Sequence, residues 1–242
     1  MALREIALTF LVLGGGLVFL GPAASQSIQG LTASPPDPNA DAVLNAVLPT
    51  LDFAGKAGRL DYNAICRGKG FESVLFPRVF VQPPSNGTTG VIAVHEIFRN
   101  DNTVVVTEGP PGIIKIRIGK MPDEILQTKL SLLTLTPEEQ YNGGIAFGAL
   151  GRNEDFKAAM DQLGIRPVPV LSDYSLNPTL PTLPHLPSSM RNVTVEQAVE
   201  AIARTFKGIV LYGVCSGSHE FDFKFVPLDV ISKAPNAETN PG

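Results

Sequence analysis

The chain has 242 residues, a formal net charge of -4 and only 17% charged residues. No block of lysine and arginine interrupts this mildly acidic sequence, which argues against a nucleic-acid-binding protein. Proline (21) and glycine (23) are plentiful and tryptophan is absent, which favours short elements joined by long connections.

The first 25 residues have the pattern of a removable secretory signal. Arg4 precedes an apolar run over residues 6–20, and small residues follow it at 21–25. The run is too short and too rich in glycine for a membrane span of ~20 residues. We therefore expect cleavage after Ala24 or Ser25, an uncleaved anchor being the alternative. The mature chain is expected to be periplasmic or secreted and to have no membrane span.

Residues 26–40 are polar and rich in proline, which predicts a flexible arm. A first α+β repeat is expected over residues 41–120. It opens with a lead-in helix from Asp41 to Leu48 and a strand from Arg59 to Cys66. A helix after Thr89, a strand at 104–106 and an alternating strand at 114–118 complete it.

A connecting strand and helix are expected over residues 121–152. The strand-like part runs from Ile125 to Leu135, and Thr136 then caps a helix that has proline at its first position and Glu139 at its third.

A second α+β repeat is expected over residues 153–230. Its lead-in is a helix capped by Asn153 and an edge strand at 165–171. Thr194 and Gln197 form a capping box before a helix that ends near Phe206, and two strands follow it. Residues 231–242 are expected to be a disordered tail.

The two repeats align with each other when positions are shifted by 105. Thr194 then falls on Thr89, Ile202 on Ile97, and the strand at 209–211 on 104–106. The expected fold class is therefore α+β. We expect two small lobes, each built on a helix-strand-strand unit with a short lead-in helix and strand.

The chain has two cysteines, Cys66 and Cys215. Export to an oxidising compartment favours a disulfide between them, and two buried thiols are the alternative. Such a bridge would constrain the unfolded chain by about 4–5 kcal/mol in the chain-entropy model.

Cys215 also lies in the sequence Gly-Val-Cys-Ser-Gly at 213–217, the pattern of a nucleophile elbow. The alternative function is thus a cysteine hydrolase that uses Cys215 with His219. An elbow requires a helix after the nucleophile, whereas residues 219–223 alternate as a strand. The three histidines are scattered, so neither a metal site nor a cofactor is expected.

Residues 191–226 resemble the short N-terminal domain of secretins and TonB-dependent receptors. The residues that carry the resemblance are Asn-Val-Thr-Val-Glu-Gln-Ala-Val at 192–199 and Ile202, followed by a glycine and two strands. Residues 86–118 form a looser copy, with Gly90 and Val91 in place of an acidic pair. The resemblance implies a non-catalytic periplasmic module that binds a protein partner in the cell envelope.

Overall fold

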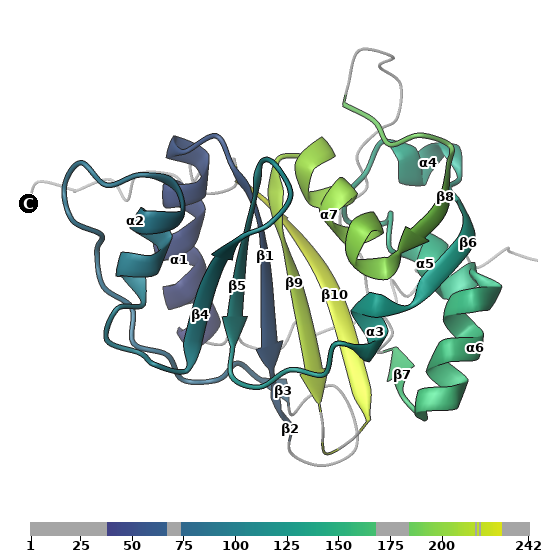
Figure 1. The fold of residues 1–242 in the computed structure, drawn as a ribbon, viewed down its shortest axis with the longest axis horizontal. Coiled ribbons are helices and arrows are strands. Elements are labelled where there is room, and N and C mark those ends of the chain that lie inside the picture. The colour runs from purple at the N-terminus through teal and green to yellow at the C-terminus, as the bar shows by residue number, and fades with distance from the viewer. Residues whose placement is uncertain (1–37, 67–73, 168–183, 216, 218, 229–242) are drawn as a thin grey trace, which may run out of the picture. The chain divides into compact units, whose positions relative to one another are not determined.

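The computed structural model describes residues 38–66, 74–167, 184–215, 217 and 219–228. Helices and strands both contribute, which confirms the α+β class. Among the described residues, six strands form the main sheet in the order β4-β5-β1-β9-β10-β7 (Figure 1). In that order their bounds are Val104–Glu108, Ile113–Ile118, Ala57–Asn63, Gly208–Cys215, Glu220–Pro227 and Arg166–Pro167.

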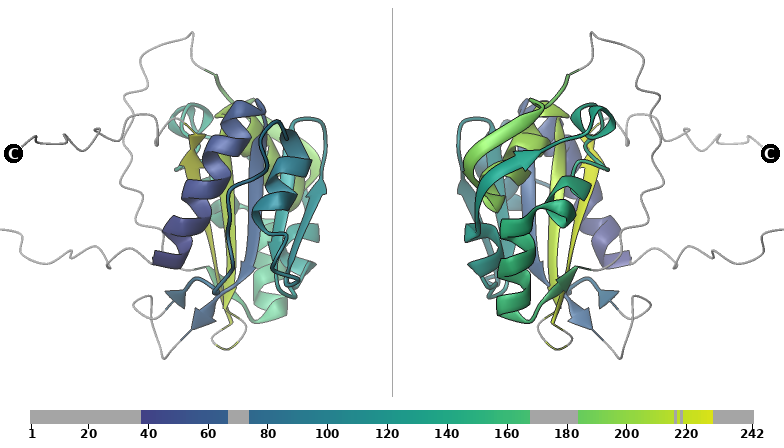
Figure 2. Two further views of the ribbon diagram at one scale, coloured as in Figure 1. Left: turned by 90° about the vertical axis from the view of Figure 1, so that its left-hand side faces the viewer. Right: turned by 90° about the vertical axis from the view of Figure 1, so that its right-hand side faces the viewer.

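Helices cover both faces of this sheet. On one face lie α1 (Pro38–Phe53) and α2 (Gly90–Ile97), and on the other lie α6 (Glu154–Leu163) and α7 (Val195–Thr205) (Figure 2). The smaller elements of the described residues are β2 (Ile65–Cys66), β3 (Val74–Leu75), α3 (Glu124–Gln127), β6 (Lys129–Thr134), α4 (Pro137–Gln140), α5 (Gly148–Arg152) and β8 (Ser189–Thr194).

Alternation along the strands divides the apolar residues into two cores. Ile114, Ile116 and Ile118 of β5 pack beneath α1 and α2, whereas Phe221 and Phe223 of β10 pack beneath α6 and α7. Successive side chains of a strand point to opposite faces, so a strand covered on both sides contributes to both cores. β9, which is buried at every position, does so.

The two predicted repeats have the same strand order. The first gives β4-β5-β1 and the second gives β9-β10-β7. In each, the first two strands are antiparallel and the lead-in strand is parallel to the second. The helices of the two repeats lie on opposite faces because the second repeat is turned over relative to the first. This shared arrangement supports the predicted duplication.

The two units predicted as small lobes share one sheet, which the sequence pattern did not predict. β1 of the first repeat pairs with β9 of the second, from Gly58 with Ile209 to Asn63 with Val214. Both units therefore belong to one sheet. The sequence pattern of each unit is local, and it gives no information about which strand edges meet across more than a hundred residues.

Several predicted boundaries also differ from the structure. The arm over 26–40 is wrong at its end because α1 begins at Pro38. The strand expected from Ile125 starts only at Lys129, since α3 precedes it. The sequence pattern did not predict β8, which pairs with β6. The signal at 1–25 and the tail at 231–242 lie outside the described residues.

No helix in the described part of the chain is both long and apolar enough to cross a membrane.

We expect Thr194→Ala to lower the free energy of unfolding by about 1 kcal/mol. The Thr194 hydroxyl accepts a hydrogen bond from the Gln197 amide at 3.2 Å, and the Gln197 side chain accepts one from the Thr194 amide at 2.8 Å. The equivalent Thr89 begins α2 without a side-chain capping bond. Thr89→Ala is therefore the matched control, and urea denaturation should find it within about 0.5 kcal/mol of the wild type. Equal losses in the two variants would contradict this account.

Candidate interaction site

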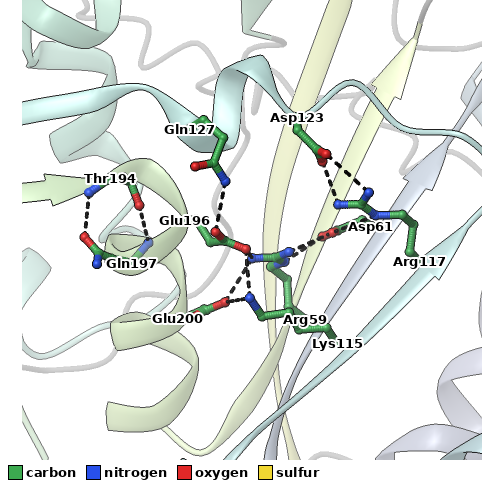
Figure 3. A network of polar contacts seen from close by, with 10 residues as sticks. All are labelled: Arg59, Asp61, Lys115, Arg117, Asp123, Gln127, Thr194, Glu196, Gln197 and Glu200. Atoms are coloured by element: carbon green, nitrogen blue, oxygen red, sulfur yellow. Dashed lines mark hydrogen bonds and ion pairs between the residues drawn. The ribbon is translucent and has the colours of Figure 1, made fainter. Parts of the chain in front are cut away.

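The junction between the two repeats holds a network of buried charges (Figure 3). Arg59 lies on β1 with 1% of its surface exposed, and its side chain faces α7. Its Nε and Nη2 donate to the two carboxylate oxygens of Asp61 at 2.8 and 3.0 Å. Its Nη1 donates to Glu196 at 2.6 Å and to Glu200 at 3.0 Å. Arg59 thus joins the central strand to the helix of the other repeat.

Lys115 of β5 completes the same cluster. Its ammonium group lies 2.8 Å from Glu196 Oε1 and 2.8 Å from Glu200 Oε1. Glu196 accepts a further bond from Gln127 of α3 at 3.1 Å. The two glutamates are four residues apart and therefore lie on one face of α7. That face binds cations from two neighbouring strands.

Burial and pairing act against each other on these carboxyl groups. Burial disfavours the charged form of Glu196, but hydrogen bonds from Lys115 and Arg59 outweigh it and lower its pKa to about 2. Burial raises the pKa of Asp61, although the charge and hydrogen bonds of Arg59 oppose the change. The ion pairs of Glu196 with Arg59 and Lys115 are therefore strongest when the Glu196 carboxyl group is ionised.

The sequence patterns do not predict this cluster. Two signals were present: opposite charges at Arg59 and Asp61 within a strand, and acids at Glu196 and Glu200 on a helix. Neither signal reveals its partner, because the two pairs are separated by more than 130 residues and meet only through sheet pairing.

At the far end of the sheet, the outer edge of β4 pairs with no strand among the described residues. The Gly119 amide donates to Thr103 O at 2.8 Å and the Gly109 amide donates to Ile113 O at 3.0 Å. Bonding groups alternate between the two sides of an antiparallel strand. The even-numbered residues, with Val106 at the centre, therefore direct their amide and carbonyl groups outward.

The composition of β4 leaves this edge available for pairing. Edge strands are commonly protected by lysine, proline or a bulge. β4 reads Val-Val-Val-Thr-Glu, and Val105 has 55% of its surface exposed. The opposite edge is β7, a strand of two residues that ends in Pro167. The two ends of the sheet thus differ, and β4 is the one suited to accept another strand.

The structure places the other predicted site residues around the β9–β10 hairpin. Cys215 ends β9, is 3% exposed and pairs with Glu220 of β10. A strand, not a helix, follows the turn, which confirms the alternation predicted there and leaves the elbow geometry unmet. His219 is exposed in the turn, with φ of 55°, and its carbonyl accepts a bond from Arg166. Cys66 lies in β2, opposite Val74 of β3.

Within the described ranges, no cluster of three or more histidine, cysteine, aspartate or glutamate residues could hold a metal ion. Comparison of the chain with protein-family models, curated proteins and solved structures finds no match.

We expect Glu196→Gln to lower stability at neutral pH and to lose this effect in acid. The lowered pKa of Glu196, about 2 against 4.5, means that its ionised form stabilises the fold above pH 4.5. This contribution is lost as the pH falls toward 2. Urea denaturation between pH 7 and 2 should therefore show the difference between wild type and variant shrinking below pH 4.5.

Glu138→Gln is the control, because Glu138 is exposed on α4 away from the network. A constant difference for Glu196→Gln across the whole range would contradict a role for the ionised carboxylate.

Proposed function

We propose that the mature chain is an exported, non-catalytic protein-interaction module that binds its partner by strand addition at β4. The observation that carries the proposal is the outer edge of β4, whose outward backbone groups at Val106 and Glu108 face an edge with no described strand. The outward amide of Val104 already donates to the Asp101 carbonyl at 3.3 Å. The resemblance of residues 191–226 to a periplasmic domain that binds proteins supports the same function.

The position of β4 in the fold suits this role. Its inner side is held by β5 over five residue pairs, from Val104 with Ile118 to Glu108 with Ile114. α2 packs against it on one face. A supported strand changes little when it accepts a neighbour, so less conformational entropy is lost on binding.

We also propose that Cys66 and Cys215 form a disulfide that fastens the ends of β1 and β9. Asn63 pairs with Val214, and the Ala64 amide donates to Val214 O at 2.8 Å, so the two strands stay together up to Cys215. Cys66 follows two residues after Ala64. No free cysteine occurs among the described residues, which supports the pairing.

We expect Val106→Pro to abolish partner binding while the fold is retained. Proline removes the outward amide of Val106, the central donor of the open edge, and spares the bonds between β4 and β5. The measurement is photocrosslinking in the exporting cell, with benzoylphenylalanine in place of the exposed Val105. The wild-type edge should give an adduct of discrete mass that is lost in Val106→Pro.

Val106→Ala is the matched control, because it removes the same branched side chain and keeps the amide. A second control carries the crosslinker at Gln162, which is exposed on α6. Equal adducts from Val106→Pro, or the same adduct from position 162, would contradict strand addition at β4.

We expect the purified mature protein, denatured without reductant, to expose no thiol to Ellman's reagent, and two thiols after reduction. Reduction should lower the free energy of unfolding by about 4–5 kcal/mol, because the long loop between the cysteines is released. Intact mass should rise by two hydrogens on reduction. Two reactive thiols before reduction would overturn the disulfide, and a fast-reacting native thiol would favour the hydrolase alternative.

A further inference from the structure

We infer that the segment bound by β4 runs parallel to it and presents an uncharged, apolar side chain to α2, in the space beside Val91 and His95. The inference rests on the proposed function and adds the direction and chemistry of the partner. It follows from the internal repeat, because the second repeat already holds a strand at the equivalent edge.

β9 is the counterpart of β4, since each is the first strand of its repeat. The outer edge of β9 is occupied by β1, which pairs with it in parallel over six residues. In the first repeat no described strand occupies the corresponding place. The β1–β9 pairing is therefore a template, within this chain, for what the edge of β4 accepts.

The helices beside the outer edges of β9 and β4 differ in the same way as the edges themselves. A shift of 105 places Val91 of α2 on Glu196 of α7, and His95 on Glu200. Glu200 is 2% exposed because β1 and its Arg59 cover it, whereas His95 is exposed. The helix position that β1 covers in the second repeat, Glu200, thus corresponds in the first repeat to the exposed His95.

The side chains at these two helix positions determine which kind of side chain an incoming strand can place against the helix. α7 offers two carboxylates, and Arg59 of the strand beneath it meets both. α2 offers Val91 and His95, neither of which can neutralise a cation, and a buried cation without a partner is strongly disfavoured. An apolar side chain at the position of Arg59 would instead pack against Val91.

The remaining charges of α2 do not alter this preference. Glu96 already accepts bonds from the Ser85 amide at 2.6 Å and from the Thr88 hydroxyl at 3.1 Å. Arg99 is exposed beyond the last turn of α2 and adds a positive charge to the neighbourhood. Ile92 has 62% of its surface exposed and extends the apolar area. The edge beside α2 therefore favours apolar segments over basic ones.

A peptide-display selection on the purified mature protein tests the inference. Ten-residue random peptides are selected on the wild type and, in parallel, on Val106→Pro. We expect the wild type to enrich peptides with alternating apolar residues and without lysine or arginine at the position facing α2. Amide chemical shifts should change at β4 and at α2 when an enriched peptide is added.

The direction of the bound peptide is measured with a nitroxide label at either end. In parallel pairing, the label at the peptide N-terminus broadens the amide of Val104, and the label at the C-terminus broadens that of Glu108. The reverse pattern would overturn the parallel arrangement and leave strand addition itself intact.

Exchange of specificity is the sharpest test. The double variant Val91→Glu with His95→Glu restores on α2 the pair of acids found on α7. We expect it to prefer an arginine version of an enriched peptide over the leucine version by about tenfold, because charge-assisted hydrogen bonds become available. Val91→Glu lies in the first turn of α2, where a negative charge is tolerated.

Ile92→Glu is the matched control, since its counterpart Gln197 caps α7 and makes no contact with Arg59 in the network described. It should leave the order of preference unchanged. No exchange in the double variant would overturn the inference about α2 while strand addition stands. Enrichment of the same peptides by Val106→Pro, or no enrichment at all, would overturn both proposals.

Discussion

The pairing of β1 with β9 is the interaction on which the architecture depends, because it joins two repeats into one sheet. Arg59 lies at the centre of this junction and binds carboxylates from its own strand and from α7. A buried ion that loses its partners is strongly destabilising, and Arg59 would lose Glu196 and Glu200 if β1 did not lie beneath α7. The ring of Tyr62 closes against Gly213 on the other face, where a Cβ would lie 2.8 Å from the ring.

The second repeat is turned over relative to the first. This orientation explains why helices cover both faces of the sheet and why the edge of β4 lies at its end. Two units of the same hand, placed side by side with opposite strand directions, must direct their helices to opposite faces of the shared sheet. In each unit considered alone, the outer edge of the first strand, β4 or β9, is open to pairing. Joining the units covers the edge of β9 with β1, and the edge of β4 remains at the end of the sheet.

Local patterns predicted much of the secondary structure. The capping boxes at Thr136 and Thr194, the helices that follow them and the phenylalanine alternation of β10 are all present. These features depend on residues close together in the chain. β8 was missed because its sequence, Ser-Met-Arg-Asn-Val-Thr, has little apolar alternation and forms a strand by pairing with β6. Pairing with a distant strand overrides weak local preference.

The sequence by itself determined the α+β class, the two helix-strand-strand units and their approximate limits, because periodicity and capping act within a few residues. It also contained the opposite charges of Arg59 and Asp61 and the two glutamates of α7, but it did not show that these side chains meet. Only the tertiary structure decided that β1 covers β9, that the charges meet there, and that β4 has no neighbouring strand on its outer edge among the described residues. Strand edges are chosen by long-range pairing, and the side chains that meet across such an edge have no fixed separation along the chain.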